Sequence, residues 1–227
     1  MLAYVTANRG DDDPGLVGER LAQRGYRLRV LHREDHPAWP ALDDAALIVS
    51  LGSEWSVYWE GVAEPVQTEV ALLRKAHERG VPVLGVCFGS QLLATALGGS
   101  VGRAPDADVE IGWVDVPHGA GQPSAVAGRW FQWHSDRWTL PIGAQLLAVT
   151  PAANQAFRCA RTLAVQFHPE VTAAVVRRWA AEVDGAELFR LGVDPATLVA
   201  ETVRLQADAA PRAHALVDWF CDEVAAK

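Results

Sequence analysis

One stretch, from residue 81 to residue 99, constrains the fold of this chain more than any other. Residues 81–86 form a short apolar run rich in β-branched side chains, which predicts a buried strand. Residues 91–97 have the period of a helix, and a pair of glycines follows them. Cys87 stands between the two segments, where the chain must turn from strand into helix.

Cys87 has a glycine two residues away on either side, in the pattern Gly85-Val86-Cys87-Phe88-Gly89. The pattern is that of a nucleophile elbow, a tight turn that holds its central residue in a strained conformation and tolerates only glycine at the flanking positions. Such a turn exposes the sulfur at the carboxyl edge of the sheet, beside the first amides of the helix. An isolated cysteine is more often an inert core residue, but the flanking glycines favour a nucleophile.

Composition indicates one large globular domain, which we expect to span residues 1–227. Half of the 227 residues are hydrophobic, and the net charge is −8 without a basic stripe, which argues against nucleic acid as a partner. No apolar run approaches the roughly 20 residues that cross a bilayer, so no membrane partner is expected. The three cysteines form no CxxC pair and no secretory signal is evident, so we expect a cytoplasmic location.

Strands and helices are predicted to alternate up to the elbow: strands at 3–7, 26–31 and 46–51, and helices at 14–24 and 66–79. This order predicts an α/β fold, with a mostly parallel central sheet and helices on both faces. Short segments at 109–116, 130–134, 145–150 and 155–158 predict antiparallel strands at one side of the sheet. His32 and His36 could suggest a metal site, but Pro37 and Pro40 predict a loop there, and we expect no metal.

Beyond residue 171 the sequence predicts only helices. A threonine cap opens a helix at 172–183, Asp194-Pro195 opens a second at 195–207, and Pro211 opens a third that ends near residue 226. We expect residues 172–227 to be a C-terminal helical extension that packs on a catalytic core of residues 1–171. A surface for docking a partner is the alternative.

Two other predicted strands end in residues that suit acyl chemistry. Gly52 follows the third strand, where its amide can act with that of Phe88 as an oxyanion hole; a plain turn glycine is the alternative. His168 and Glu170 follow the strand at 163–167 and can project from the same side of the sheet edge. An imidazole oriented by a carboxylate is what a cysteine nucleophile needs, although a His-Pro-Glu triplet alone can also be a structural corner.

Together these segments resemble the class I, triad-type glutamine amidotransferase family. The resemblance rests on residues 85–91 (GVCFGSQ), on residues 165–170 (VQFHPE) and on Leu51-Gly52, and it covers roughly residues 3–171. Residues 132–136 (QWHSD) are similar to the segment that lines the glutamine pocket in free-standing, GMP-synthase-like members. The resemblance implies the flavodoxin-like fold of this family.

The resemblance also implies an activity, the hydrolysis of L-glutamine to glutamate and ammonia without a cofactor. Cys87 would be the nucleophile, His168 the base and then the acid, and Glu170 the group that orients His168. The amides of Gly52 and Phe88 would hold the oxyanion, and water would hydrolyse a γ-glutamyl thioester. The residues implied in binding the substrate are Gln91, His134, Ser135 and Asp136.

Two departures from the family pattern leave alternatives open. Ser53-Glu54 stands where the family commonly has a second glycine and a proline, and the sequence contains no P-loop or ATP-pyrophosphatase loop. Either a separate synthetase subunit receives the ammonia, or the protein acts alone. A γ-glutamyl hydrolase with the same triad is the second candidate, with Trp55, Tyr58 and Trp59 lining a larger pocket. A binding module with vestigial catalytic residues is the third, and the intact triad argues against it.

Overall fold

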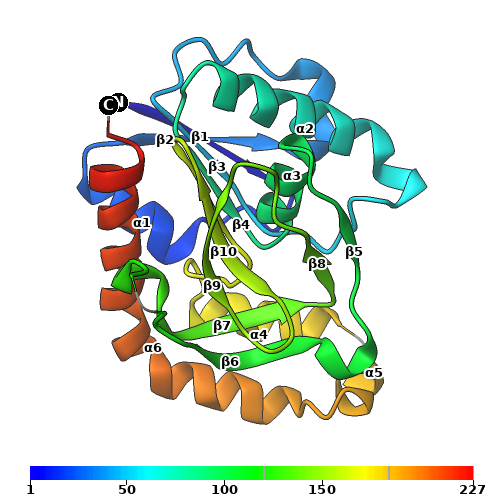
Figure 1. The fold of residues 1–227 in the computed structure, drawn as a ribbon. Coiled ribbons are helices and arrows are strands. Elements are labelled where there is room, and N and C mark those ends of the chain that lie inside the picture. Colours follow the sequence, from blue (N-terminus) through cyan, green and yellow to red (C-terminus); the bar gives the residue numbers. More distant parts are fainter. Residues whose placement is uncertain (120, 184, 227) are drawn as a thin grey trace.

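The computed structural model describes residues 1–119, 121–183 and 185–226, and its centre is a seven-stranded sheet in the order β2-β1-β3-β4-β11-β10-β9 (Figure 1). The first five strands of this order run parallel, whereas β10 is antiparallel to both β11 and β9. The predicted α/β fold with a mostly parallel sheet is confirmed. The strands are β1 (Leu2–Ala7), β2 (Arg27–His32), β3 (Leu47–Ser50), β4 (Val83–Val86), β9 (Gln145–Val149), β10 (Asn154–Cys159) and β11 (Thr162–Val165).

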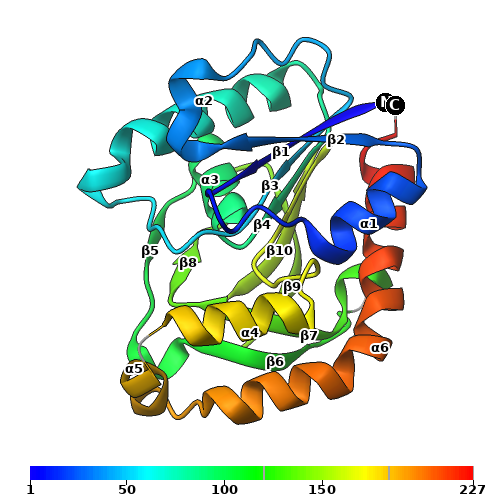
Figure 2. The ribbon, with the colours of Figure 1, turned by 180° about the vertical axis from the view of Figure 1, so that it is seen from behind.

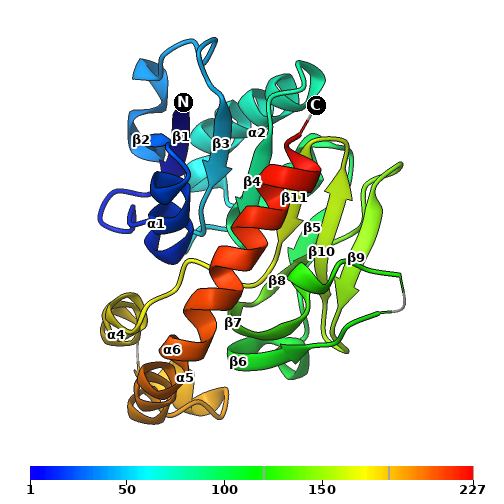
Figure 3. The same ribbon diagram turned by 90° about the vertical axis from the view of Figure 1, so that its left-hand side faces the viewer.

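Helices cover both faces of the sheet, because side chains of the buried strands point alternately to either side. Along β3, for example, Val49 belongs to the core under α1 (Gly15–Gln23), whereas Ile48 belongs to the core under α2 (Ala63–Glu78) and α3 (Phe88–Ala96). The C-terminal part of the long helix α6 lies on the same face as α1 (Figure 3). Within the described residues, no helix combines the length and apolar character needed to cross a membrane.

The predicted antiparallel strands divide between two sheets. Only β9 and β10 join the central sheet, while β6 (Glu110–Val116) pairs with β7 (Gly128–His134) in a separate ribbon. Two short strands that the sequence pattern did not indicate, β5 (Val101–Arg103) and β8 (Asp136–Trp138), form a third pair. The β6–β7 ribbon stays apart from the central sheet because its apolar side packs against α4 (Ala173–Glu182) and the first part of α6.

The C-terminal helices differ from the prediction at Pro211. Thr172 caps α4 as predicted, but α6 (Pro195–Trp219) is continuous, contains Pro211, and follows a short helix, α5 (Gly185–Arg190). Proline normally interrupts a helix because it lacks an N–H and its ring meets the preceding turn. Here the helix bends about midway instead (Figure 2), and both halves are held by burial, one against the β6–β7 ribbon and the other against the central sheet. Tertiary packing therefore outweighs the local signal.

Several predicted boundaries shift by a few residues. The helix after the elbow begins at Phe88, three residues before the predicted start, so the turn from β4 has Cys87 as its only residue. The segment at 32–36, predicted as a loop, contributes instead to a 3-10 helix at Arg33–Ala38. Both segments lie at the carboxyl edge of the sheet, where β1, β3, β4 and β11 end together.

The turn at Cys87 has the strained geometry that the glycine pattern predicts. Cys87 has φ 49° and ψ −107°, values that a side-chain-bearing residue rarely adopts. A Cβ on Gly89 would lie 2.0 Å from the backbone oxygen of Ser50, and a Cβ on Gly85 would lie 2.6 Å from that of Gly89. Backbone atoms cannot move aside as a flexible side chain can, so both glycines are sterically required.

Gly89→Ala should therefore lower the free energy of unfolding by about 3 kcal/mol or more, because the added methyl group forces β3 and α3 apart. Gly61→Ala is the matched control, since a Cβ there meets nothing within 4 Å. Urea denaturation of both variants checks the expectation. Equal stability of Gly89→Ala and the unsubstituted protein would contradict the steric account of the elbow.

Candidate active site

Cys87 lies at the N-terminus of α3 with its sulfur almost entirely buried. Its Sγ is 3.8 Å from the backbone oxygen of Trp133, and Nε2 of Gln166 lies 3.6 Å from Sγ as a donor. The first N–H groups of a helix have no acceptor within the helix, so those of Phe88 and Gly89 are available beside the sulfur. The sulfur therefore lies at a helix start, between a backbone acceptor and a side-chain donor.

His168 and Glu170 form a buried pair just beyond β11. The Nδ1 atom of His168 is 2.7 Å from Oε1 of Glu170, and both side chains are about 95% buried. The carboxylate accepts the Nδ1 proton, and Nε2 of His168 has no hydrogen-bond partner within the described part of the chain. The backbone oxygen of Glu170 accepts from the amide of Leu16, which ties this turn to the start of α1.

The groups packed around His168 determine its pKa. Burial alone lowers the pKa of His168, but the Glu170 carboxylate and the Cys87 sulfur raise it, and the pKa ends well above its usual range. The Cys87 sulfur contributes both through its charge and through a side-chain interaction with the imidazole. The imidazole is therefore held ready as an acid beside the sulfur.

Gly52 lies against both Cys87 and His168. A Cβ added to Gly52 would be 3.0 Å from Cε1 of His168 and 3.8 Å from Cβ of Cys87. A side chain at this position would press on the imidazole, which gives a steric reason for glycine at the end of β3. The structure thus brings together the predicted triad and both residues predicted to form the oxyanion hole.

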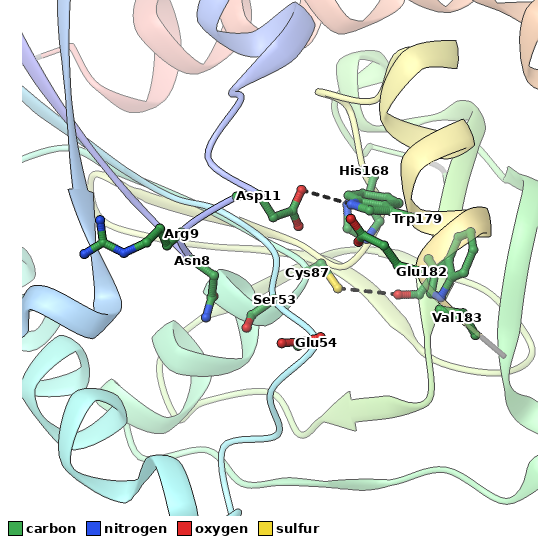
Figure 4. A pocket seen from close by; sticks show the side chains of 12 residues that line it. Asn8, Arg9, Asp11, Ser53, Glu54, Cys87, His168, Trp179, Glu182 and Val183 are labelled. Atoms are coloured by element: carbon green, nitrogen blue, oxygen red, sulfur yellow. Dashed lines mark hydrogen bonds between the residues drawn. The ribbon is translucent and has the colours of Figure 1, made fainter.

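Cys87 and His168 open onto a cavity of about 250 Å³ (Figure 4). The loop after β1, the segment after β3 and the C-terminal end of α4 surround it. Its lining residues are Asn8, Arg9, Gly10, Asp11, Ser53, Glu54, Cys87, Trp133, His168, Trp179, Glu182 and Val183. The cavity is several times the roughly 30 Å³ that one water molecule occupies in the liquid, so it has room for a substrate side chain.

Two tryptophans form a wall of this cavity: Trp133, from the segment 132–136 that the sequence indicated, and Trp179, which it did not. The ring of Trp179 lies 5.0 Å from that of His168 and 5.8 Å from that of Trp133, edge-on in both cases. The indole N–H of Trp179 donates to Asp11 over 2.9 Å, which links α4 to the loop after β1. Nothing in the sequence pattern of residues 172–183 indicated that Trp179 would reach the site.

Trp55, Tyr58 and Trp59, predicted to line a larger pocket, are not among the residues that line this cavity. The hydroxyl of Tyr58 donates instead to Oδ1 of Asp136 over 2.9 Å, which explains why the loop after β3 turns toward β8. The aromatic wall of this cavity comes from β7 and α4 instead.

The residues predicted to bind the rest of glutamine lie nearby but outside the lining of the cavity. Gln91 is buried on α3, and its side-chain oxygen has no partner within the described part of the chain. The ring nitrogens of His134 lie 3.0 Å from the backbone oxygen of Asp136 and 3.0 Å from Oε2 of Glu110. The hydroxyl of Ser135 accepts from Arg103. The side chain of His134 therefore holds the segment in shape.

Comparisons with known proteins agree with this geometry. The model of the family described as glutamine amidotransferase class-I matches residues 18–177. The chain belongs to this family. Among curated proteins, the glutamine-hydrolyzing GMP synthase of Bordetella avium is 32% identical over 207 residues, which cover 77% of this chain and 37% of that protein. The corresponding enzyme of Methylobacillus flagellatus is 36% identical over 183 residues, which cover 70% of this chain and 33% of that protein.

Solved structures of amidotransferases have the same fold along almost the whole chain. A glutamine amidotransferase from Thermotoga maritima superposes with a TM-score of 0.86 at 25% identity, covering 98% of this chain and 99% of the other. A glutamine amidotransferase from Methylobacillus flagellatus gives 0.82 at 25% identity, covering 98% and 94%. The chain spans about a third of the length of the GMP synthases it matches, but nearly the full length of these two proteins. The resemblance inferred from the sequence is confirmed.

Glu170→Gln should lower the pKa of His168, because burial then acts without the opposing carboxylate. An unfolded histidine titrates near 6.5, below the raised folded-state pKa. The stabilisation that His168 provides is therefore complete below about pH 6.5 and is lost as pH rises through the folded-state pKa. NMR titration of the His168 ring, with urea unfolding between about pH 6 and pH 9, checks both effects. An unchanged His168 titration in the variant would contradict the role given to the carboxylate.

Proposed function

We propose that this protein is a glutaminase that hydrolyses the side-chain amide of L-glutamine to glutamate and ammonia. The observation that carries the proposal is the shared cavity of Cys87 and His168, with His168 oriented by Glu170 over 2.7 Å. Family membership supports the choice of glutamine as substrate.

In the proposed reaction, His168 already holds the proton of the Cys87 thiol, in keeping with its raised pKa, when the Cys87 sulfur attacks the amide carbon of glutamine. The carbonyl oxygen becomes an oxyanion held by the amides of Gly52 and Phe88. His168 then gives its proton to the departing nitrogen, ammonia leaves, and a γ-glutamyl thioester remains on Cys87. Water attacks this thioester as His168 takes one of its protons, which releases glutamate and returns the Cys87 sulfur beside a protonated His168.

The amino-acid end of glutamine is proposed to extend toward Gln91 and the segment from His134 to Asp136. The unpartnered side-chain oxygen of Gln91 supports this direction, because a buried polar atom without a partner is destabilising until a ligand supplies one. The backbone of Ser135 and the carboxylate of Asp136 would meet the charged end of the substrate. The Trp133 oxygen near Cys87 marks where this segment approaches the sulfur.

The ammonia is proposed to pass to an acceptor on a separate synthetase subunit. The GMP synthases that match this chain are about three times its length, so their remaining two thirds have no counterpart here. The surface beside the cavity entrance, from Glu54 to Glu182, is where such a subunit would have to face. The three free cysteines agree with the proposed cytoplasmic location.

Purified protein should release glutamate and ammonia from glutamine in equal amounts, and Cys87→Ala should lower the rate by about 10⁴-fold or more. Cys221→Ala is the matched control, because Cys221 lies after α6, beside Arg24 and Tyr26 and outside the cavity lining, and should leave the rate unchanged. Stopped assays for both products test this. If no turnover occurs, a glutamine-like electrophile should still alkylate Cys87. Neither turnover nor labelling would contradict the proposal.

A γ-glutamyl hydrolase is the second candidate, favoured by the extent of the cavity on the His168 side. The general acid delivers its proton to the departing nitrogen, so any substituent on that nitrogen lies near His168, between Trp179 and Glu182. Three carboxylates and one arginine line the cavity, and within the described residues Glu54 has no ion-pair partner. A leaving amine that carries a second positive charge would be attracted to these carboxylates.

The second candidate predicts that a γ-glutamyl amide of a diamine is hydrolysed faster than glutamine and up to about fivefold faster than the amide of a neutral amine of equal length. The ratio corresponds to about 1 kcal/mol for an exposed ion pair, and Glu182→Gln should reduce it. Values of kcat/KM for the three substrates decide the matter. Rates that fall steadily as the amine becomes larger would reject the hydrolase and leave the glutaminase.

A further inference from the structure

We propose that Arg33 is a positioning residue that fixes both halves of the oxyanion hole, and that the buried carboxylate of Glu69 holds Arg33 in place. This inference rests on the proposed function, because an oxyanion hole matters only if acyl chemistry takes place at Cys87. Neither Arg33 nor Glu69 lines the cavity, and neither belongs to the predicted triad.

Arg33 reaches the site from the outer strand of the parallel part of the sheet. It follows β2, and its side chain is only 1% exposed. All five N–H groups of its guanidinium have acceptors. Nη1 donates to the backbone oxygen of Gly52 (2.9 Å) and to Asn8 (2.7 Å), Nη2 to the backbone oxygen of Leu51 (2.8 Å) and to Glu69 (3.4 Å), and Nε to Glu69 (2.7 Å).

The contact with Leu51 controls the first half of the hole. The oxygen of Leu51 and the N–H of Gly52 belong to one planar trans peptide group, in which they point in opposite directions. By holding the Leu51 oxygen, Arg33 therefore sets the direction of the Gly52 N–H on the other side of the peptide. The second hydrogen bond, to the oxygen of Gly52, restrains the next peptide as well.

The same guanidinium contacts the second half of the hole. Its central carbon lies 5.0 Å from the centre of the Phe88 ring, within the range of an attractive cation–aromatic interaction. Phe88 is the first residue of α3 and is 1% exposed, so its ring cannot move independently of the helix start. The planar guanidinium of Arg33 thus contacts both segments that carry the two amides, and it fixes their relative position.

Glu69 gives Arg33 a fixed location. It is fully buried on α2, and its carboxylate also accepts from Ser50 over 2.7 Å and from the hydroxyl of Thr6. These hydroxyls come from β3 and β1, so the carboxylate is anchored to both strands. A buried carboxylate without a cation is strongly unfavourable, which keeps the guanidinium in this position. Lysine offers one nitrogen and cannot make the same set of contacts.

The test compares Arg33→Lys and Glu69→Gln with Val70→Ala, which loosens the packing of α2 at the next residue without touching the network. We expect kcat for glutamine to fall about 100-fold in Arg33→Lys and about tenfold in Glu69→Gln, with KM within about threefold of the original value. Val70→Ala should retain its kcat after a comparable loss of thermal stability.

A second measurement distinguishes a damaged oxyanion hole from a less reactive Cys87 thiol. Glutamate γ-semialdehyde forms a thiohemiacetal with a cysteine, and its oxygen then occupies the oxyanion position. Its affinity should fall in parallel with kcat in Arg33→Lys, whereas the rate of Cys87 alkylation by iodoacetamide should change less than about threefold, since that reaction places no oxyanion in the hole.

Unchanged kcat in folded Arg33→Lys, a loss confined to KM, or an equal loss in Val70→Ala would overturn the proposal. Failure of both network variants to fold would also overturn it, because the pair would then serve folding alone. Absence of turnover and of semialdehyde binding in the unsubstituted protein would instead reject the proposed function, so the two failures are distinguishable.

Discussion

The strained turn at Cys87 is the constraint on which the rest of the site depends. A backbone with positive φ at a cysteine persists only when the surrounding structure fixes it, and here the strand before the turn and the helix after it are both buried on all sides. Gly89 lies directly against the backbone of Ser50, so the same contact that permits the turn also sets the distance between α3 and β3. This contact therefore sets the relative position of the two predicted oxyanion donors, Gly52 after β3 and Phe88 at the start of α3.

Three buried carboxylates, each paired with a cationic or imidazole side chain, organise the surroundings of that turn. Glu170 pairs with His168, Glu69 with Arg33, and Glu110 with His134. Each pair shapes a different part of the site: the imidazole, the end of β3, and the segment proposed to hold the substrate. Buried charges are unfavourable unless they are paired, so each pair has essentially one arrangement. The cavity is thereby preorganised, which is what electrostatic stabilisation of an oxyanion requires.

How far the sequence predicts the structure depends on the distance over which each signal acts. The elbow and the His-Pro-Glu turn are local patterns whose steric and chemical demands are visible within a few residues, and the structure places them together. Pro211 is misleading because local propensity cannot report that both halves of α6 are buried. For the same reason the local pattern could not show that β6 and β7 form a separate ribbon, because the helices that cover them, α4 and α6, come much later in the chain.

The aromatic wall and the Arg33–Glu69 pair could not be predicted for a related reason. Arg33 and Glu69 are 36 residues apart, in segments whose patterns indicated only a charged loop and an amphipathic helix. Trp179 lies in a helix that seemed to belong to an extension outside the catalytic core, yet it packs on the catalytic histidine candidate. A buried ion pair or a shared cavity wall is defined by three-dimensional proximity, which composition and periodicity do not contain.

The central claim is that Cys87 carries the acyl group during turnover. The most direct test is to mix the protein with glutamine, quench with acid within milliseconds to seconds, and map adducts by mass spectrometry of peptides. The account predicts a γ-glutamyl group on the peptide that contains Cys87. Treatment with hydroxylamine, which cleaves thioesters, should remove this group. Turnover of glutamine without any adduct on Cys87, or with the adduct on Cys159 or Cys221 instead, would contradict it.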